Sequence, residues 1–278
     1  MRCVALVAIL GIVQQFALPA ATPVDSAWDT LNKALAGNED CKRQALAALG
    51  EVDPENQRAV KVVVDALQDK NPLVRQSAAL ALGAMKARQA IGSLRDAISD
   101  KGEVAFAAAK ALADMGDSGG RDMFVAVLAG ERSDAPGMVA SGIRDAKNRL
   151  RHPQGLLLEG AEDATGAFFG PAGMGITAAK EAFREKGSSS RAVAASYLAK
   201  DPDPYAVTLL EWALSDSSWG VRTAAAKGLA KRGNQATIPK LQFLLEDTNV
   251  AVRTMSAAAI LRITDRNTAT ETAQSKYQ

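Results

Sequence analysis

Acid–arginine pairs spaced six residues apart are the most regular chemistry-bearing pattern in this 278-residue sequence. A guanidinium group can donate two parallel hydrogen bonds to a carboxylate, or bridge carbonyl groups of neighbouring turns, so such pairs suit structural linkage more directly than catalysis. We therefore predict that these residues join neighbouring structural units. The pairs are Asp69 and Arg75, Glu185 and Arg191, Asp216 and Arg222, and Asp247 and Arg253.

Residue types used in catalysis and metal binding are scarce. His152 is the only histidine, which excludes a metal centre built from several histidines and leaves one candidate for a serine–histidine–acid triad. It follows Arg151 at the end of an expected helix, where a cation would interact favourably with the helix dipole. No two carboxylates are singled out for acid and base roles. We expect no catalytic residue, no metal and no bound cofactor.

The residues that follow each arginine repeat one helix face. After Arg222, for example, a small residue comes three positions later at Ala225 and an aliphatic one seven positions later at Leu229. The same pattern without arginine begins at Lys42 and Ala105. Successive copies lie about 30 residues apart, with two helix-length segments in each period, and this arrangement is typical of a stacked helical solenoid.

We predict an all-α fold, a right-handed alpha-solenoid of about six helical hairpins covering residues 25–264. The first helix, about 26–36, and the last, 250–263, have no sequence neighbour to pair with, and we expect both to be unpaired capping helices. Residues 265–278 are dominated by polar side chains and are predicted to form a disordered tail.

Three segments carry a resemblance to a known repeat family: Asp69-Lys-Asn-Pro-Leu-Val-Arg75, Asp216-Ser-Ser-Trp-Gly-Val-Arg222 and Asp247-Thr-Asn-Val-Ala-Val-Arg253. Each precedes an alanine-rich helix, and together they resemble HEAT repeats of the short, phycobilin-lyase-like type. The resemblance implies that turn aspartates and helix arginines form a ladder between repeats. Related HEAT proteins include deoxyhypusine hydroxylases, whose iron site needs repeated His-Glu pairs that this sequence lacks.

The amino terminus has the organisation of an export signal. Arg2 precedes an apolar run from Cys3 to Val13, and small residues follow between Ala17 and Ala21. The run is shorter than the about 20 residues that cross a bilayer. We predict a cleaved signal peptide at residues 1–21, a periplasmic or secreted protein, and no stable membrane span after cleavage; an uncleaved anchor is the alternative.

Residues 152–175 interrupt the repeat pattern within the fourth hairpin and combine many glycines with large apolar groups. No lysine followed by serine or threonine stands where a phosphate-binding loop needs it. Phe168, Phe169 and Met174 are therefore candidates either for packing against the helices or for contacting a partner. Exposed aromatic groups at that density are costly in a monomer, which favours packing.

The charge pattern does not indicate nucleic-acid binding, because 33 basic and 31 acidic residues alternate along most of the sequence. We expect an exported, non-catalytic scaffold that binds a protein or peptide partner along its concave surface. The alternative is a lyase-like or other catalytic HEAT protein with a small-molecule pocket under the loop 154–178. The aromatic residues expected to pack in the core, rather than to act as interface anchors, are Trp28, Tyr205, Trp212 and Trp219.

The predicted register can be tested at Ala225. A bulky side chain there, as in Ala225→Phe, should overpack the contact between stacked helices and cost about 1–3 kcal/mol of stability. Thermal denaturation of the variant measures this effect. An unchanged midpoint would show that the register is wrong.

Overall fold

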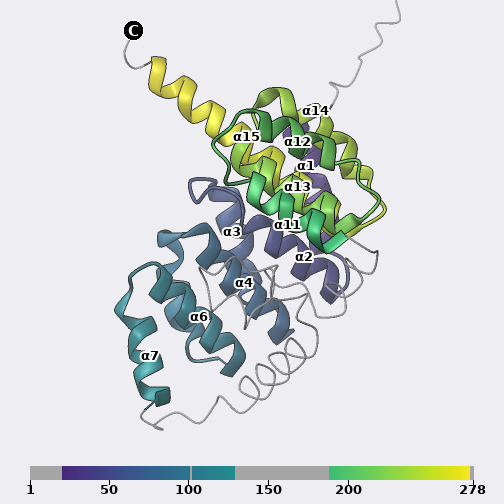
Figure 1. The fold of residues 1–278 in the computed structure, drawn as a ribbon. Helices are drawn as coiled ribbons and strands as arrows, with labels where there is room; N and C mark the ends of the chain where they lie inside the picture. Colours follow the sequence, from purple (N-terminus) through teal and green to yellow (C-terminus); the bar gives the residue numbers. More distant parts are fainter. Residues whose placement is uncertain (1–20, 101, 129–187, 276–278) are drawn as a thin grey trace, which may run out of the picture.

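The computed structural model describes residues 21–100, 102–128 and 188–275, and within them every regular element is a helix. Figure 1 shows the helices stacked side by side. The predicted all-helical solenoid is therefore confirmed. The amino-terminal group contains α1 (Pro23–Leu35), α2 (Glu39–Leu49), α3 (Gln57–Ala66), α4 (Pro72–Met85), η1 (Arg88–Ala90), α5 (Ile91–Ala97), α6 (Gly102–Asp114) and α7 (Ser118–Leu128). The carboxy-terminal group contains α11 (Ser188–Leu198), α12 (Tyr205–Ala213), α13 (Trp219–Arg232), η3 (Gln235–Thr237), α14 (Ile238–Phe243), η4 (Leu244–Glu246) and α15 (Val250–Ser275).

Polar residues at the helix starts fix several of these boundaries. The side chain of Asn38 accepts a hydrogen bond from the third residue of α2, and Asn56 does the same for α3. Asn71 accepts from Leu73 N and is followed by proline at the first position of α4. These bonds satisfy amide groups that have no partner inside the helix, and proline has no amide hydrogen to satisfy.

The register of the core follows the repeat found in the sequence. In five copies the position three residues after the anchor is fully buried, and so is the aliphatic position four residues further on, whereas after Arg191 these positions, Ala194 and Leu198, are exposed and half-buried. Small side chains at the first of these positions let stacked helices approach closely, and the aliphatic groups fill the remaining space. The small residues are Ala45, Ala78, Ala108, Ala225 and Ser256; the aliphatic ones are Leu49, Leu82, Leu112, Leu229 and Ile260.

The two groups of helices form one continuous stack. The first helices of successive pairs contact one another, α2 with α4 and α4 with α6 in one group, and α11 with α13 and α13 with α15 in the other. Helix α15 also packs against α2, which joins the groups. The spatial order of first helices is therefore α11, α13, α15, α2, α4 and α6, so the carboxy-terminal group precedes the amino-terminal group in space.

The prediction of unpaired capping helices is wrong, because α1 and α15 pair with each other. Ala27, Trp28 and Leu31 bury the inner face of α1, and the Arg58 guanidinium of α3 lies 4.0 Å from the Trp28 ring centre. Helix α1 also contacts α14 and α2, the neighbours expected of a second helix at this place in the stack. The two ends of the chain thus build one repeat, which we call the composite repeat.

The predicted disordered tail is also not observed as far as Ser275, where α15 ends. Extending a helix that is already packed needs no new nucleus, so even a polar sequence can continue it. The hydroxyl groups of Thr268 and Thr272 donate to the carbonyl groups four residues earlier, at 2.9 and 2.8 Å. Figure 1 shows these last turns projecting from the stack.

The composite repeat predicts that a change in α1 weakens the other end of the chain. Leu31→Ala removes a fully buried side chain and should cost about 2–5 kcal/mol. Amide hydrogen exchange should then show reduced protection in α15, which lies more than 200 residues away in sequence. Asn32→Ala, at the exposed neighbouring position, is the control. Protection lost in α1 alone would contradict the pairing.

Candidate functional site

The acid–arginine pairs form a ladder along the turns between repeats. Arg222 Nη1 donates to the backbone carbonyl groups of Asp216 and Ser217, at 2.8 and 2.9 Å. Its Nε and Nη2 donate to the two carboxylate oxygens of Asp247 in the next turn, at 2.8 and 2.9 Å. One side chain therefore clamps its own turn and joins it to the next.

The same geometry recurs at the other rungs. Arg191 binds the carboxylate of Asp216 with two hydrogen bonds, and Arg75 binds that of Asp100. Lys42, in the arginine position of α2, pairs with Asp69 at 2.6 Å. The sequence analysis did not assign Asp100 to the ladder, because no arginine stands six residues after it. The signal was present nonetheless, since Arg75 and Asp100 have the 25-residue separation of the other rungs.

The ion pairs keep the ladder charged. The hydrogen bond from Lys42 lowers the pKa of Asp69, and the hydrogen bond from Arg191 does the same for Asp216. The carboxylate of Asp100 raises the pKa of Arg75. A carboxylate held ionised by a permanent cation is unsuited to proton transfer near neutral pH. These residues therefore act in structure.

A second charge cluster ties the composite repeat to its neighbours. Glu51, in the loop between α2 and α3, pairs with Lys227 of α13 at 2.8 Å. Arg262 of α15 donates to the carbonyl group of Glu51 at 2.6 Å and pairs with Asp53 at 3.2 Å. Burial alone would raise the pKa of Glu51, but Lys227, Lys231 and Arg262 together outweigh it and lower the pKa.

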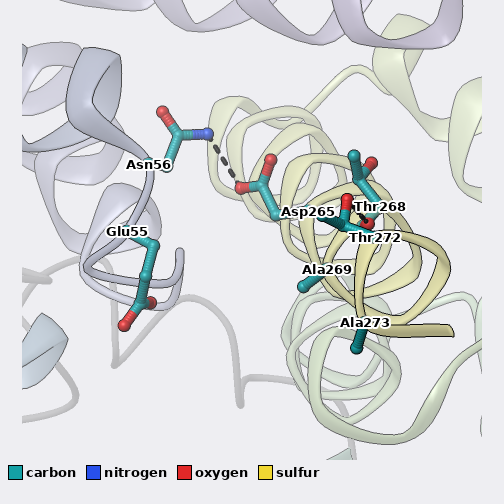
Figure 2. A pocket seen from close by; sticks show the side chains of 7 residues that line it. All are labelled: Glu55, Asn56, Asp265, Thr268, Ala269, Thr272 and Ala273. Atoms are coloured by element: carbon teal, nitrogen blue, oxygen red, sulfur yellow. Dashed lines mark hydrogen bonds between the residues drawn. The ribbon is translucent and has the colours of Figure 1, made fainter. Parts of the chain in front are cut away.

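An open groove of about 550 Å³ lies between this loop and the last turns of α15. In Figure 2, Asn56 points at Asp265 and donates to it at 2.8 Å, while Glu55 points away. Burial raises the pKa of Asp265, and the nearby Asp53 and Glu55 add to the effect, although the Asn56 hydrogen bond opposes it. The remaining lining residues are Thr268, Ala269, Thr272 and Ala273. Among the residues that the structure describes, no group of three or more His, Cys, Asp or Glu could hold a metal ion.

Three aromatic side chains stand out on the surface of the second helices. Tyr205 and Trp212 of α12 are 62% and 81% exposed, and Phe243 of α14 is 84% exposed. The prediction that Tyr205 and Trp212 pack in the core is therefore wrong. It is confirmed for Trp28, which is buried, and for Trp219, which is half-buried against the core.

Trp212 and Phe243 occupy the same place in adjacent repeats. Each comes two residues after a fully buried leucine of its helix, Leu210 or Leu241. The corresponding residues of α1, α3 and α5, again two after a fully buried aliphatic, are charged: Lys33, Asp65 and Asp96. In α7 the residue two after the buried Met123 is Val125, which is 57% exposed, so among the described second helices only α12 and α14 carry an aromatic group at this place. We call Tyr205, Trp212 and Phe243 the aromatic surface.

Sequence reasoning missed this surface because α12 carries large apolar residues on both its buried and its exposed face. Ala206, Leu210 and Leu214 form the buried stripe, which leaves Tyr205 and Trp212 facing outward with Thr208 and Ser215. The 31-residue separation of Trp212 and Phe243 was the available signal.

Several predicted residues lie outside the described ranges. These are the signal segment as far as residue 20, the insertion 152–175 with His152, Phe168, Phe169 and Met174, and the ladder acid Glu185.

Comparison with known proteins agrees with the fold. First, the stacked helical pairs and the ladder define the chain as an alpha-solenoid. More specifically, the HEAT-repeat family profile matches residues 29–113 and 179–262, and the chain belongs to this family. The match is to HEAT repeats in general and does not show the phycobilin-lyase-like subtype.

Among solved structures, the chain is similar to human deoxyhypusine hydroxylase in complex with glycerol, with 18% identity and a TM-score of 0.34 over 88% of this chain and 100% of that one. No curated protein matches. None of the described helices is long and apolar enough to cross a membrane.

The Glu51 cluster predicts a pH dependence of stability. Because the pKa of Glu51 is lowered in the folded state, its contribution is present above the ordinary value of 4.5 and is lost as the pH falls through the folded-state pKa. Glu51→Gln should cost about 1.5–3 kcal/mol at pH 7 and reduce the loss of stability on acidification. Urea denaturation between pH 7 and pH 3 measures both effects.

Glu55→Gln is the matched control, because Glu55 lies in the same loop and is exposed. Equal effects of the two substitutions would contradict the role assigned to Glu51.

Proposed function

We propose that this chain is an exported, non-catalytic scaffold that binds a protein or peptide partner through the aromatic surface of α12 and α14. The observation that carries the proposal is the pair Trp212 and Phe243, two large aromatic groups more than 80% exposed at equivalent places in adjacent repeats. Clustered exposed aromatics are costly in a monomer and mark interaction sites. Export rests on the sequence of residues 1–21.

The surroundings of the aromatic surface fit a binding site with apolar anchors and a polar edge. Lys240 of α14 pairs with Glu211 of α12, and Thr237 donates to Glu211 at 3.1 Å, so the charges beside the aromatics are already paired. A partner can therefore cover the rings without desolvating an isolated charge. Tryptophan and tyrosine are the residues that most often dominate interface energetics.

The spacing of the two anchors suggests how a partner lies. Packed helices are about 8–10 Å apart. A peptide in the polyproline II conformation advances about 3.1 Å per residue with three residues per turn, so side chains three residues apart lie on one face and would contact both anchors. Such a peptide would run along the stack, across the helix axes.

Selection from a displayed library of random peptides, followed by calorimetry, tests the proposal. Trp212→Ala and Phe243→Ala should each weaken the selected peptides by roughly 30-fold or more, as expected for an anchor worth about 2 kcal/mol. Asp65→Ala and Asp96→Ala remove the side chains at the same place in other repeats and should leave the affinity unchanged. Selected peptides that bind all four variants equally well would rule out the aromatic surface.

A further inference from the structure

Within the described part of the chain, the ladder has an open rung at the composite repeat. Arg253 of α15 donates from Nη1 to the carbonyl groups of Asp247 and Thr248, at 2.6 and 3.1 Å. Its Nε and Nη2 have no hydrogen-bond or ion-pair partner among the described residues. These are the two atoms that hold a carboxylate in the other arginine rungs.

Three sibling rungs show what these atoms bind. Nε and Nη2 reach carboxylate oxygens at 2.5 and 2.7 Å from Arg75, at 2.7 and 3.0 Å from Arg191, and at 2.8 and 2.9 Å from Arg222. In Arg75 and Arg222, as in Arg253, Nη1 is anchored on two carbonyl groups of the preceding turn. The guanidinium of Arg253 is therefore already held in the carboxylate-binding orientation.

The open rung lies where the carboxy-terminal group of helices is followed in the stack by the amino-terminal group. The repeat after α15 begins with α2, whose preceding turn contains Ala36, Gly37 and Asn38 and no acidic residue. Ala36 takes the place of the turn aspartate, because it lies two residues before the helix-capping Asn38 and six before Lys42, as Asp247 lies before Asn249 and Arg253.

The backbone of the same turn also has an N–H group equivalent to one that binds the ladder aspartate in other repeats. The N–H groups of Ser218 and Asn249 each donate at 2.8 Å to the ladder aspartate two residues earlier. The corresponding N–H of Asn38 has no acceptor among the described residues. Gly37 and Asn38 are exposed, so a ligand can approach from solvent.

We propose that Arg253, with the N–H of Asn38, forms a binding site for one carboxylate group, supplied by an aspartate or glutamate side chain of a partner protein. Such a side chain completes the ladder as the next turn aspartate does elsewhere. Two N–H donors of one guanidinium match the two oxygens of a planar carboxylate. The site uses none of the residues of the aromatic surface, so its test is independent of the test of the proposed function.

Nuclear magnetic resonance of arginine Nε–H groups tests the site in the full chain. Acetate is titrated against chloride at constant ionic strength, and the Arg253 Nε–H resonance should shift downfield and saturate. The Arg222 resonance should not move, because its carboxylate is already present. Inorganic phosphate and the peptide Ac-Gly-Asp-Gly-NH2 are titrated in the same way.

Two variants make the result decisive. Arg253→Gln removes the fork and its charge and should abolish the acetate-dependent rise in thermal midpoint expected of the unmodified chain. Asp100→Ala opens the rung of Arg75, whose Nε–H resonance should then respond to acetate as that of Arg253 does.

The outcomes separate the possible ligands. Saturable shifts with acetate and with the aspartyl peptide support the proposal. Shifts with acetate but not with the peptide would mean that the site takes free carboxylates rather than protein side chains. A response to phosphate alone, or no saturation with any probe while Arg75 responds in Asp100→Ala, would overturn it.

Discussion

Each helix of this protein buries one apolar face, and that face must be covered by helices on both sides in the stack. The first and last described helices meet this requirement in an unusual way. Helix α1 and helix α15 meet it by covering each other, with Trp28 and Leu31 buried on one side and Ile260 and Ile263 on the other. The composite repeat therefore converts two short stacks into one and places the chain ends near its middle.

Polar interactions reinforce the stack at two places. Along the turns, arginines join successive repeats with paired hydrogen bonds to aspartates. Beside the composite repeat, where the ladder has no aspartate, the loop of Glu51 and Asp53 is held by Lys227 and Arg262 from the other end of the chain. The partly buried glutamate is stable as an anion because three cations surround it. The open rung of Arg253 is thus tolerated, since the junction is secured elsewhere.

The structural regularity also explains why the exceptions carry the functional proposals. A solenoid needs the same buried residues in every repeat but places little constraint on what the second helices expose. Trp212 and Phe243 depart from the charged residues at the same place in α1, α3 and α5, and both are exposed, so they do not contribute to the core. Likewise, Ala36 stands in place of the turn aspartate and leaves a guanidinium free to bind another carboxylate.

The sequence by itself determined the repeat, its register and the ladder residues other than Asp100. Periodic small and aliphatic residues, such as Ala225 and Leu229, report local helix faces, and the acid–arginine spacing reports local turns. The tertiary structure decided which helices pair at the ends, which acid each arginine binds, and whether Trp212 faces the core or the solvent. These depend on contacts between residues far apart in the chain, and no local period records which distant surface will cover an apolar face.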